Sequence, residues 1–241
     1  MSDLVITRRR KKYKFAKFNE LPNCFQFEGW LREACHPELV SGSRKESITW
    51  ILKQVQDDNN RKLILEIGAG SALFLVELAK LHPENFYIAI DIKSDRLYRG
   101  ARKANDEKIK NIVFVRSDIW RINEILPENS VDEIWLTFPD PYPKKSDARH
   151  RLTHPRFLKM YKTILRKGPT LTQLRFKTDN GGLFDWSIEQ FKQNGWQTKE
   201  ISRDLHSSSL SDEYKITTTY EQKFLNEGLS IFFASFVIEL E

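Results

Sequence analysis

At 241 residues, the chain is long enough for one large α/β domain with a small appendage, and its net charge of +6, with a pI near 9.2, favours a polyanionic partner. Cys24 and Cys35 are the two cysteines, which excludes a disulfide framework and a cysteine-rich zinc site, and we predict no metal centre. No stretch approaches the ~18 apolar residues of a membrane span, and the N-terminus lacks the apolar run of a signal peptide, so we expect a cytoplasmic protein without a membrane partner.

The N-terminal quarter of the sequence differs in character from the rest. Residues 1–34 are predicted to form a basic arm and a docking segment. The arm contains the run Thr7–Lys17, in which aromatic residues alternate with lysine and arginine. Such a run can neutralise phosphates and stack on bases, or it can be a solvated tail. We interpret residues 35–60 as an inserted surface segment that contains a short amphipathic helix.

From Arg61 onward, short apolar stretches alternate with helical patterns, which predicts a main domain over residues 61–241. We expect strands at Leu63–Ile67, Phe86–Ile90, Ile112–Val115, Val131–Leu136 and Leu171–Phe176, and a last strand within Leu229–Leu240. Helices are expected at 72–82, Leu97–Ala104, Ile122–Leu126, Phe157–Leu165 and Gly181–Gln193. Strands separated by helices predict a doubly wound α/β fold, in which a mostly parallel sheet carries helices on both faces.

A carboxylate lies at or just after the end of each of the first four strands. These residues are Glu66, Asp91, Asp118 and Asp140, and their spacings are 25, 27 and 22 residues. The carboxyl ends of parallel strands meet at one edge of a sheet and form the ligand crevice, so we expect the four acids to line one site. A row of acids suits a ligand with hydroxyl groups, amino groups or a positive charge rather than phosphate.

The turn after the first strand reads Glu66-Ile67-Gly68-Ala69-Gly70 and stands between a strand and a helix, where a nucleotide-binding glycine turn is found. A dinucleotide-binding fold would have a third glycine at Leu73, and the carboxylate of Glu66 would repel a pyrophosphate. S-Adenosylmethionine has a sulfonium and an ammonium group and no phosphate, so it suits this turn better. Gly68 and Gly70 would allow the backbone to approach such a ligand closely.

We predict the roles of the other carboxylates from the strands that they follow. Asp91 would accept the ribose hydroxyls of the ligand, and Asp118 would lie beside the adenine amino group. Three prolines stiffen the segment Phe138–Lys145 and fix Asp140 relative to the crevice. Cations suited to RNA phosphates follow, namely Lys144, Lys145, Arg149, His150, Arg151 and Arg156. Asp179, after the fifth strand, either caps the next helix or contacts a substrate.

Together these segments resemble the bacterial tRNA (guanine-N7-)-methyltransferase family of the TrmB type. The resemblance is carried by Leu65-Glu66-Ile67-Gly68-x-Gly70, Phe138–Lys145, Arg151-Leu152-Thr153-x-Pro155-Arg156-Phe157, Thr178-Asp179 and Thr218-x-Tyr220-Glu221. It implies methylation of N7 of a guanine in the variable loop of tRNA, with S-adenosylmethionine as donor, by a class I methyltransferase fold whose last strand is antiparallel. It implies donor-binding roles for Glu66, Gly68, Gly70, Asp91, Asp118 and Asp140, with Asp140 as the catalytic residue. It also implies substrate-binding roles for Lys144, Asp179, Thr218, Thr219, Tyr220 and Glu221.

The chemistry of this reaction limits what the protein must provide. Guanine N7 has a lone pair and no proton, so no general base is required and catalysis depends on position and charge. The chain departs from the family at Ser71-Ala72, where Lys-Gly is usual, and at Tyr142, where Trp is common. An amino-group methyltransferase, an inactive RNA-binding protein of the same fold and an NAD-linked oxidoreductase stay open as alternatives. Whether the protein is a monomer or a dimer also stays open.

Overall fold

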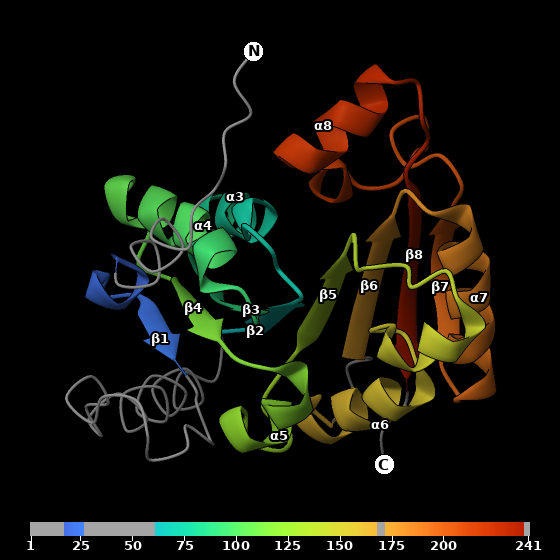
Figure 1. The fold of residues 1–241 in the computed structure, drawn as a ribbon, viewed down its shortest axis with the longest axis horizontal. Coiled ribbons are helices and arrows are strands. Elements are labelled where there is room, and N and C mark those ends of the chain that lie inside the picture. Colours follow the sequence, from blue (N-terminus) through green and yellow to red (C-terminus); the bar gives the residue numbers. More distant parts are fainter. Residues whose placement is uncertain (1–16, 27–60, 168–171, 239–241) are drawn as a thin grey trace.

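The computed structural model describes residues 17–26, 61–167 and 172–238, and within them eight strands form one sheet in the order β1-β4-β3-β2-β5-β6-β8-β7 (Figure 1). The strands are β1 (Cys24–Gln26), β2 (Leu63–Ile67), β3 (Phe86–Asp91), β4 (Ile112–Arg116), β5 (Glu133–Thr137), β6 (Thr172–Thr178), β7 (Gln197–Ser202) and β8 (Phe232–Ile238). Their pairings are parallel apart from those of β8, which runs antiparallel to β6 and β7. The predicted mostly parallel sheet with an antiparallel last strand is therefore confirmed.

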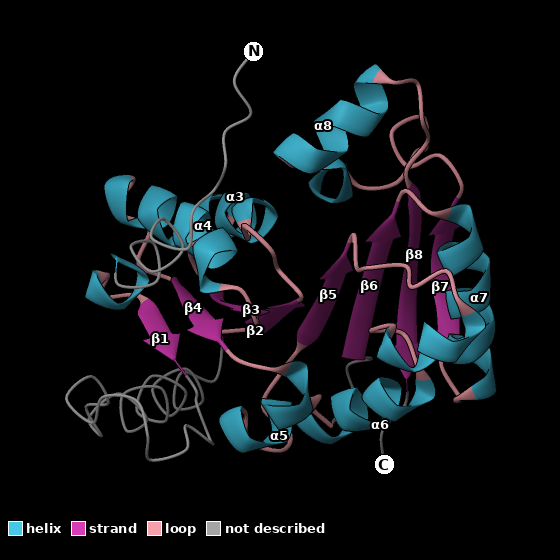
Figure 2. Ribbon diagram, in the orientation of Figure 1, coloured by secondary structure: helices cyan, strands magenta, loops and turns pink. Residues whose placement is uncertain are grey.

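Helices cover both faces of the sheet, as Figure 2 shows. The α-helices are α3 (Leu73–Leu81), α4 (Ser94–Asp106), α5 (Ile122–Ile125), α6 (Pro155–Ile164), α7 (Gly181–Gln193) and α8 (Thr219–Asn226), and short 3-10 helices are η2 (Ile119–Arg121), η3 (Lys145–His150) and η4 (Asp212–Lys215). Side chains of α5, α6 and α7 pack on one face, and those of α3, α4 and α8 pack on the other. The fully buried strands β2 and β3 supply both layers because successive strand residues point to opposite faces.

The predicted elements of the central sheet agree with the structure to within a few residues. The helix at Gly181–Gln193 has the predicted limits, and β2 does as well. The fourth strand was expected from Val131, but β5 begins at Glu133, because Val131 forms an isolated parallel bridge with Leu165 instead.

Among the strands and α-helices named above, β1, β7 and α8 were not predicted. β1 adds a short parallel strand at the edge next to β4, and β7 lies at the opposite edge. Most side chains of β7 are exposed, so its sequence lacks the apolar alternation that marks a half-buried strand. Helix α8 begins at the segment that we interpreted only as a substrate motif.

The predicted basic run Thr7–Lys17 and the predicted insert at 35–60 lie outside the described residues, except for Lys17. The division of the chain at residues 34 and 60 therefore stays a prediction. Within the described part of the chain, no helix combines the length and the apolar character needed to cross a bilayer.

Candidate active site

The carboxyl edge of the sheet opens into two adjoining cavities. The larger cavity has a volume of about 570 Å3, and its lining includes Glu66, Gly68, Gly70, Asp140, Thr218 and Tyr220. The smaller cavity has a volume of about 260 Å3, and its lining includes Gly68, Asp91, Asp118 and Asp140. Gly68 and Asp140 belong to both linings, so the cavities meet at these two residues. The structure thus brings the four acids of neighbouring strands to one place.

The glycine turn between β2 and α3 needs its glycines for two different reasons. Both have a positive φ, +70° at Gly68 and +56° at Gly70, which side chains disfavour. A Cβ atom on Gly68 would lie 2.9 Å from Cδ1 of Leu152, whereas one on Gly70 would have no atom within 4 Å. Gly68 therefore lets Leu152 pack against the turn, and Gly70 leaves open space for a ligand. Ala72 follows with φ +52°, so this turn also holds an alanine in the left-handed region.

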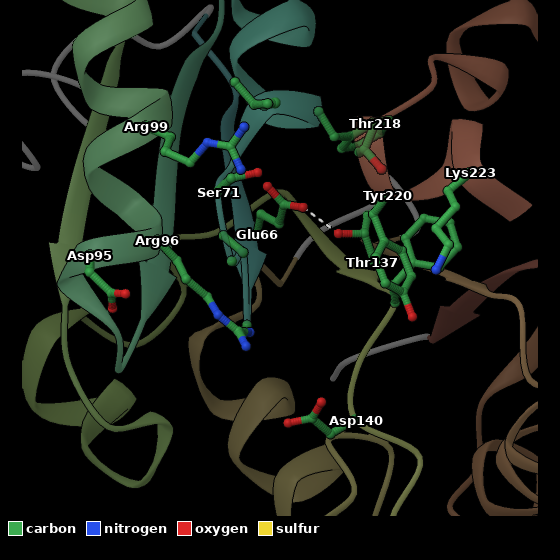
Figure 3. Close-up of a pocket in the computed structure, with 16 residues that line it drawn as sticks. Glu66, Ser71, Asp95, Arg96, Arg99, Thr137, Asp140, Thr218, Tyr220 and Lys223 are labelled. Atoms are coloured by element: carbon green, nitrogen blue, oxygen red, sulfur yellow. Dashed lines mark hydrogen bonds between the residues drawn. The ribbon is translucent and has the colours of Figure 1, made fainter. Parts of the chain in front are cut away.

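Glu66 is buried at the floor of the larger cavity. Thr137 donates a hydrogen bond to its Oε1, whereas its Oε2 has no hydrogen-bond partner among the described residues (Figure 3). Burial raises the pKa of this carboxyl to about 8, although the Thr137 hydrogen bond acts in the opposite direction. A buried oxygen without a partner costs free energy, so the site is suited to a ligand that brings a positive charge or a donor.

Asp91 and Asp118 both organise backbone at the smaller cavity. The two carboxylate oxygens of Asp91 accept hydrogen bonds from the amides of Gly70 (2.8 Å) and Lys93 (2.7 Å). Asp91 therefore joins the glycine turn to the end of β3, and burial raises the pKa of its carboxyl. Asp118 accepts a hydrogen bond from the amide of Trp120 (3.1 Å) at the start of η2. These contacts fix the two carboxylates at the cavity wall.

The proline-rich loop presents Asp140 as an exposed side chain where the cavities meet. Phe138 and Tyr142 on either side of it have positive φ angles of +49° and +41°, which is uncommon for such side chains. Arg151 donates hydrogen bonds to the carbonyls of Pro141 and Tyr142, both at 3.0 Å, and its guanidinium stacks 4.4 Å from the ring centre of Trp186. The loop is thus held in a strained conformation by Arg151.

Helix α8 forms the opposite wall of the larger cavity, and its start is built by Thr218 and Glu221. Thr218 Oγ1 accepts from the amide of Glu221 (3.0 Å), and the Glu221 carboxylate accepts from the amide of Thr218 (3.3 Å), which makes a capping box. Tyr220 is 53% exposed and packs edge-on against Phe138, with ring centres 5.4 Å apart. Tyr220 therefore offers an aromatic surface to the cavity.

Glu221, for which the motif resemblance implies a substrate-binding role, is a buried residue of α8. Its side chain is 0% exposed and forms an ion pair with the equally buried Lys177 of β6, with Nζ at 2.8 Å from Oε1. Nε2 of His206 lies 2.8 Å from the same oxygen, and Lys177 also donates to the carbonyl of Ile216 (3.0 Å). Burial lowers the pKa of Lys177, whereas Glu221 acts to raise it. Glu221 thus anchors α8 to the sheet.

Two other predicted substrate residues, Lys144 and Asp179, are absent from both linings. Lys144 is exposed at the start of η3 and is absent from both linings. Asp179 is partly buried, which raises the pKa of its carboxyl, and it does not cap α7. Asn180 does so by accepting from the amide of Leu183 (2.8 Å), so the capping interpretation of Asp179 was wrong. Thr219 is the first residue of α8, and its side chain is outside the description.

Two residues that bind the buried carboxylates of the site were not predicted from the sequence. Neither Thr137 nor Lys177 was assigned a role. Thr137 meets Glu66 because β5 and β2 are adjacent in the sheet, and Lys177 of β6 meets Glu221 because α8 packs against the sheet. No local sequence pattern contains either contact. Arg151 was assigned to a phosphate-binding cluster, but it binds two carbonyls of the loop instead.

The arrangement fits a cationic adenosine compound such as S-adenosylmethionine. The unpartnered Oε2 of Glu66 lies on the same edge as the open space at Gly70, and both residues line the larger cavity. Asp91 and Asp118 stand together in the adjoining cavity, where hydroxyl and amino groups would find acceptors. Among the described residues, no group of His, Cys, Asp and Glu side chains could hold a metal ion.

Comparison with known proteins identifies relatives along most of the chain. A family model described as "Putative methyltransferase" matches residues 60–234. A tRNA (guanine-N(7)-)-methyltransferase of Macrococcus caseolyticus is 39% identical over 198 residues, which are 81% of this chain and 90% of the relative. The protein of the same name from Cytophaga hutchinsonii is 37% identical over 181 residues, 74% of this chain and 80% of that protein.

Solved structures agree on the fold at much lower identity. The 16S rRNA methyltransferase KamB superimposes with a TM-score of 0.56 at 14% identity, over 83% of this chain and 94% of that one. A 16S rRNA (adenine(1408)-N(1))-methyltransferase from Catenulisporales acidiphilia, a mutant with SAM as cosubstrate, gives a TM-score of 0.53 at 15% identity, over 81% and 91% of the two chains. These similarities support the class I methyltransferase fold.

Proposed function

We propose that this chain, which belongs to the tRNA (guanine-N(7)-)-methyltransferase family, uses S-adenosylmethionine to methylate N7 of a guanine in tRNA. The observation that carries the proposal is the similarity to relatives of this name over as much as 90% of a relative's length. The finer proposal is that the guanine lies in the variable loop, as the resemblance of the motifs implies. Because tRNA is the substrate, we expect the protein to act in the cytoplasm.

We assign donor binding to the residues that line the two cavities at their junction. Asp91 and Asp118 would hold the adenosine part, because their carboxylates stand at the wall of the smaller cavity. Gly68 and Gly70 would let the backbone approach, and Glu66 would face the positively charged part from the floor of the larger cavity. When bound, the donor supplies an electrophilic methyl group on a cationic sulfur.

Glu66 must become ionised to pair with a cation. The pKa of about 8 means that its carboxyl is mostly protonated at neutral pH when no cation lies beside it. A positive charge close to Oε2 would lower that pKa, so binding of the donor should release a proton from Glu66.

Asp140 is proposed as the catalytic residue because it is exposed where the two cavities join. Guanine N7 needs no deprotonation, so the protein acts by holding the base in line with the methyl group. The methylated base is cationic, and the carboxylate of Asp140 would stabilise the charge that develops on it. Tyr220 offers a ring on which the guanine can stack.

The remaining substrate residues are proposed in two groups. Thr218 lines the larger cavity, and Thr219 and Tyr220 follow it on α8, so this helix would contact the target nucleotide. Lys144 and Asp179 would contact more distant parts of the tRNA. Glu221 would act on the substrate indirectly, by holding α8 in place.

The test is to incubate the protein with bulk tRNA and methyl-labelled donor, and then to cleave the tRNA chemically at 7-methylguanosine. We expect label in tRNA and a cleavage at one guanine of the variable loop. Label on adenine or on protein would favour an amino-group methyltransferase. Binding of tRNA without any label would favour an inactive RNA-binding protein.

A further inference from the structure

Two arginines on α4, Arg96 and Arg99, have no role in the donor and substrate sites proposed above. Arg96 and Arg99 are exposed, lie almost one turn apart on the helix, and both line the larger cavity. Neither guanidinium forms a hydrogen bond or an ion pair with a described residue, although the charge of Arg96 acts on Asp91 and lowers the pKa of that carboxyl. The next cations of the helix differ in this respect, because Arg102 lies 3.8 Å from Asp106 and Lys103 pairs with Glu77. Two free guanidinium groups at a cavity mouth are available to an anion.

A third cation stands across the same cavity. Lys223 of α8 lines it, and Figure 3 shows Lys223 and Tyr220 on the side opposite to Arg96 and Arg99. Lys223 is mostly exposed and has only a long contact of 3.9 Å with Glu227. Asp95 is the one carboxylate that accompanies the arginines on the α4 side of the lining. The cavity therefore has a buried acid, Glu66, at its floor, an exposed acid, Asp140, at its junction with the smaller cavity, and mainly cations at its rim.

This separation of charge matches the two parts of a nucleotide. A base that is methylated must leave its stack and enter the cavity, and its flanking phosphates then stay at the mouth. The acidic floor suits a base that becomes cationic, whereas guanidinium groups bind phosphate oxygens in a bidentate manner. The methionine carboxylate of the donor is the other anion near this site, but one carboxylate does not account for cations on both walls.

We infer that Arg96 and Arg99 of α4, with Lys223 of α8 opposite, bind the phosphates that flank the target guanine, so that the tRNA strand crosses the cavity mouth between the two helices. This inference rests on the proposed function and extends it to a surface on two helices. His150 and Arg156, which follow the proline-rich loop, would then contact another part of the tRNA, because they line the smaller cavity.

The test compares the double variant Arg96→Gln/Arg99→Gln and the variant Lys223→Gln with the wild type. The dissociation constant for tRNA and its dependence on salt are measured by direct binding, together with the Michaelis constant for the donor. Each lost phosphate contact reduces the slope of log affinity against log salt by about 0.7–0.9. We expect the double variant to weaken tRNA binding at least tenfold and to lower this slope by about 1.5, with an unchanged Michaelis constant for the donor.

Arg102→Gln is the matched control, since it removes an exposed arginine from the same helix that lines neither the larger nor the smaller cavity. It should leave both the affinity and the slope unchanged. A slope of log tRNA affinity against log salt that stays unaltered in the double variant would overturn the inference. A rise in the Michaelis constant for the donor alone would also overturn it, because that result would assign the arginines to the methionine carboxylate. If the wild type forms no 7-methylguanosine, the proposed function fails, whereas the salt slope of tRNA binding still decides this inference.

Discussion

Replacing Lys177 by Met should destabilise the protein strongly, because it removes one partner of a fully buried ion pair. Lys177 and Glu221 are both 0% exposed, and three oxygen atoms, two of Glu221 and the carbonyl of Ile216, lie within 3.0 Å of Lys177 Nζ. Removing Lys177 leaves the buried Glu221 carboxylate without its ammonium partner, and losing one side of such a pair costs about 3–5 kcal/mol. A domain has only about 5–15 kcal/mol of stability, so the variant would be close to its folding limit.

The second variant of this experiment separates charge from packing. Glu221→Gln in the Lys177→Met background removes the stranded negative charge but keeps a side chain of the same shape in the capping box. The double variant should therefore be more stable than the sum of the single effects predicts, by about 1–3 kcal/mol. The measurement is urea denaturation of the wild type, both single variants and the double variant.

Lys80→Met provides the control, since Lys80 and Glu107 form an ion pair of the same chemistry at 2.9 Å on the exposed surface. This variant should not change the denaturation midpoint measurably. Two results would refute the reasoning that burial makes this pair an anchor for α8. One is that Lys177→Met and Glu221→Gln change the free energy of unfolding additively, and the other is that Lys177→Met and Lys80→Met change it equally.

Three further predictions concern the donor side of the site. The pKa of Glu66 in the folded protein is about 8, against an ordinary value of 4.5. The contribution of this carboxyl to the free energy of unfolding is therefore complete below pH 4.5 and is lost as the pH rises through 8. Glu66→Gln should consequently gain stability relative to the wild type as the pH rises from about 5 to about 9. A difference between the melting temperatures of the variant and the wild type that stays constant across this range would contradict the assignment. Gly68→Ala should cost about 1–3 kcal/mol, because it places a side chain at φ +70° with its Cβ 2.9 Å from Leu152, and an unchanged unfolding midpoint would count against this. Arg151→Lys should lower the turnover number, because a lysine cannot donate to both loop carbonyls with the geometry of a guanidinium. The affinity for the donor, measured by calorimetry, should stay similar. Full turnover in this variant would show that the loop does not depend on Arg151.

The sequence was most informative where one residue pattern decides one local structure. Buried strands such as β2 and β3 are continuous apolar runs, and their spacing identified the sheet and its row of acids. Helix α8 was also within reach, because Thr218 and Glu221 have the spacing of a capping box. The cap of α7 was misplaced by one residue, although a helix that starts at Gly181 already requires Asn180 before it.

Contacts between distant segments could not be predicted in this way. Lys177 and Glu221 are 44 residues apart, and nothing near either residue indicates that both are buried together. The same holds for Thr137 and Glu66, which meet only because β2 and β5 are neighbours in the sheet. Edge strand β7 was missed because its exposed side chains have no apolar face to reveal it.

The most direct test of the central claim is to compare 7-methylguanosine formation by the wild type and by Asp140→Asn, with donor binding measured on both proteins. Asn keeps the shape of the side chain and removes its charge, so the comparison isolates the electrostatic role of Asp140 at the junction of the cavities. The account predicts methylation of one variable-loop guanine by the wild type, and a variant that loses nearly all turnover but still binds the donor. Undiminished methylation by Asp140→Asn, or complete loss of donor binding in that variant, would contradict it.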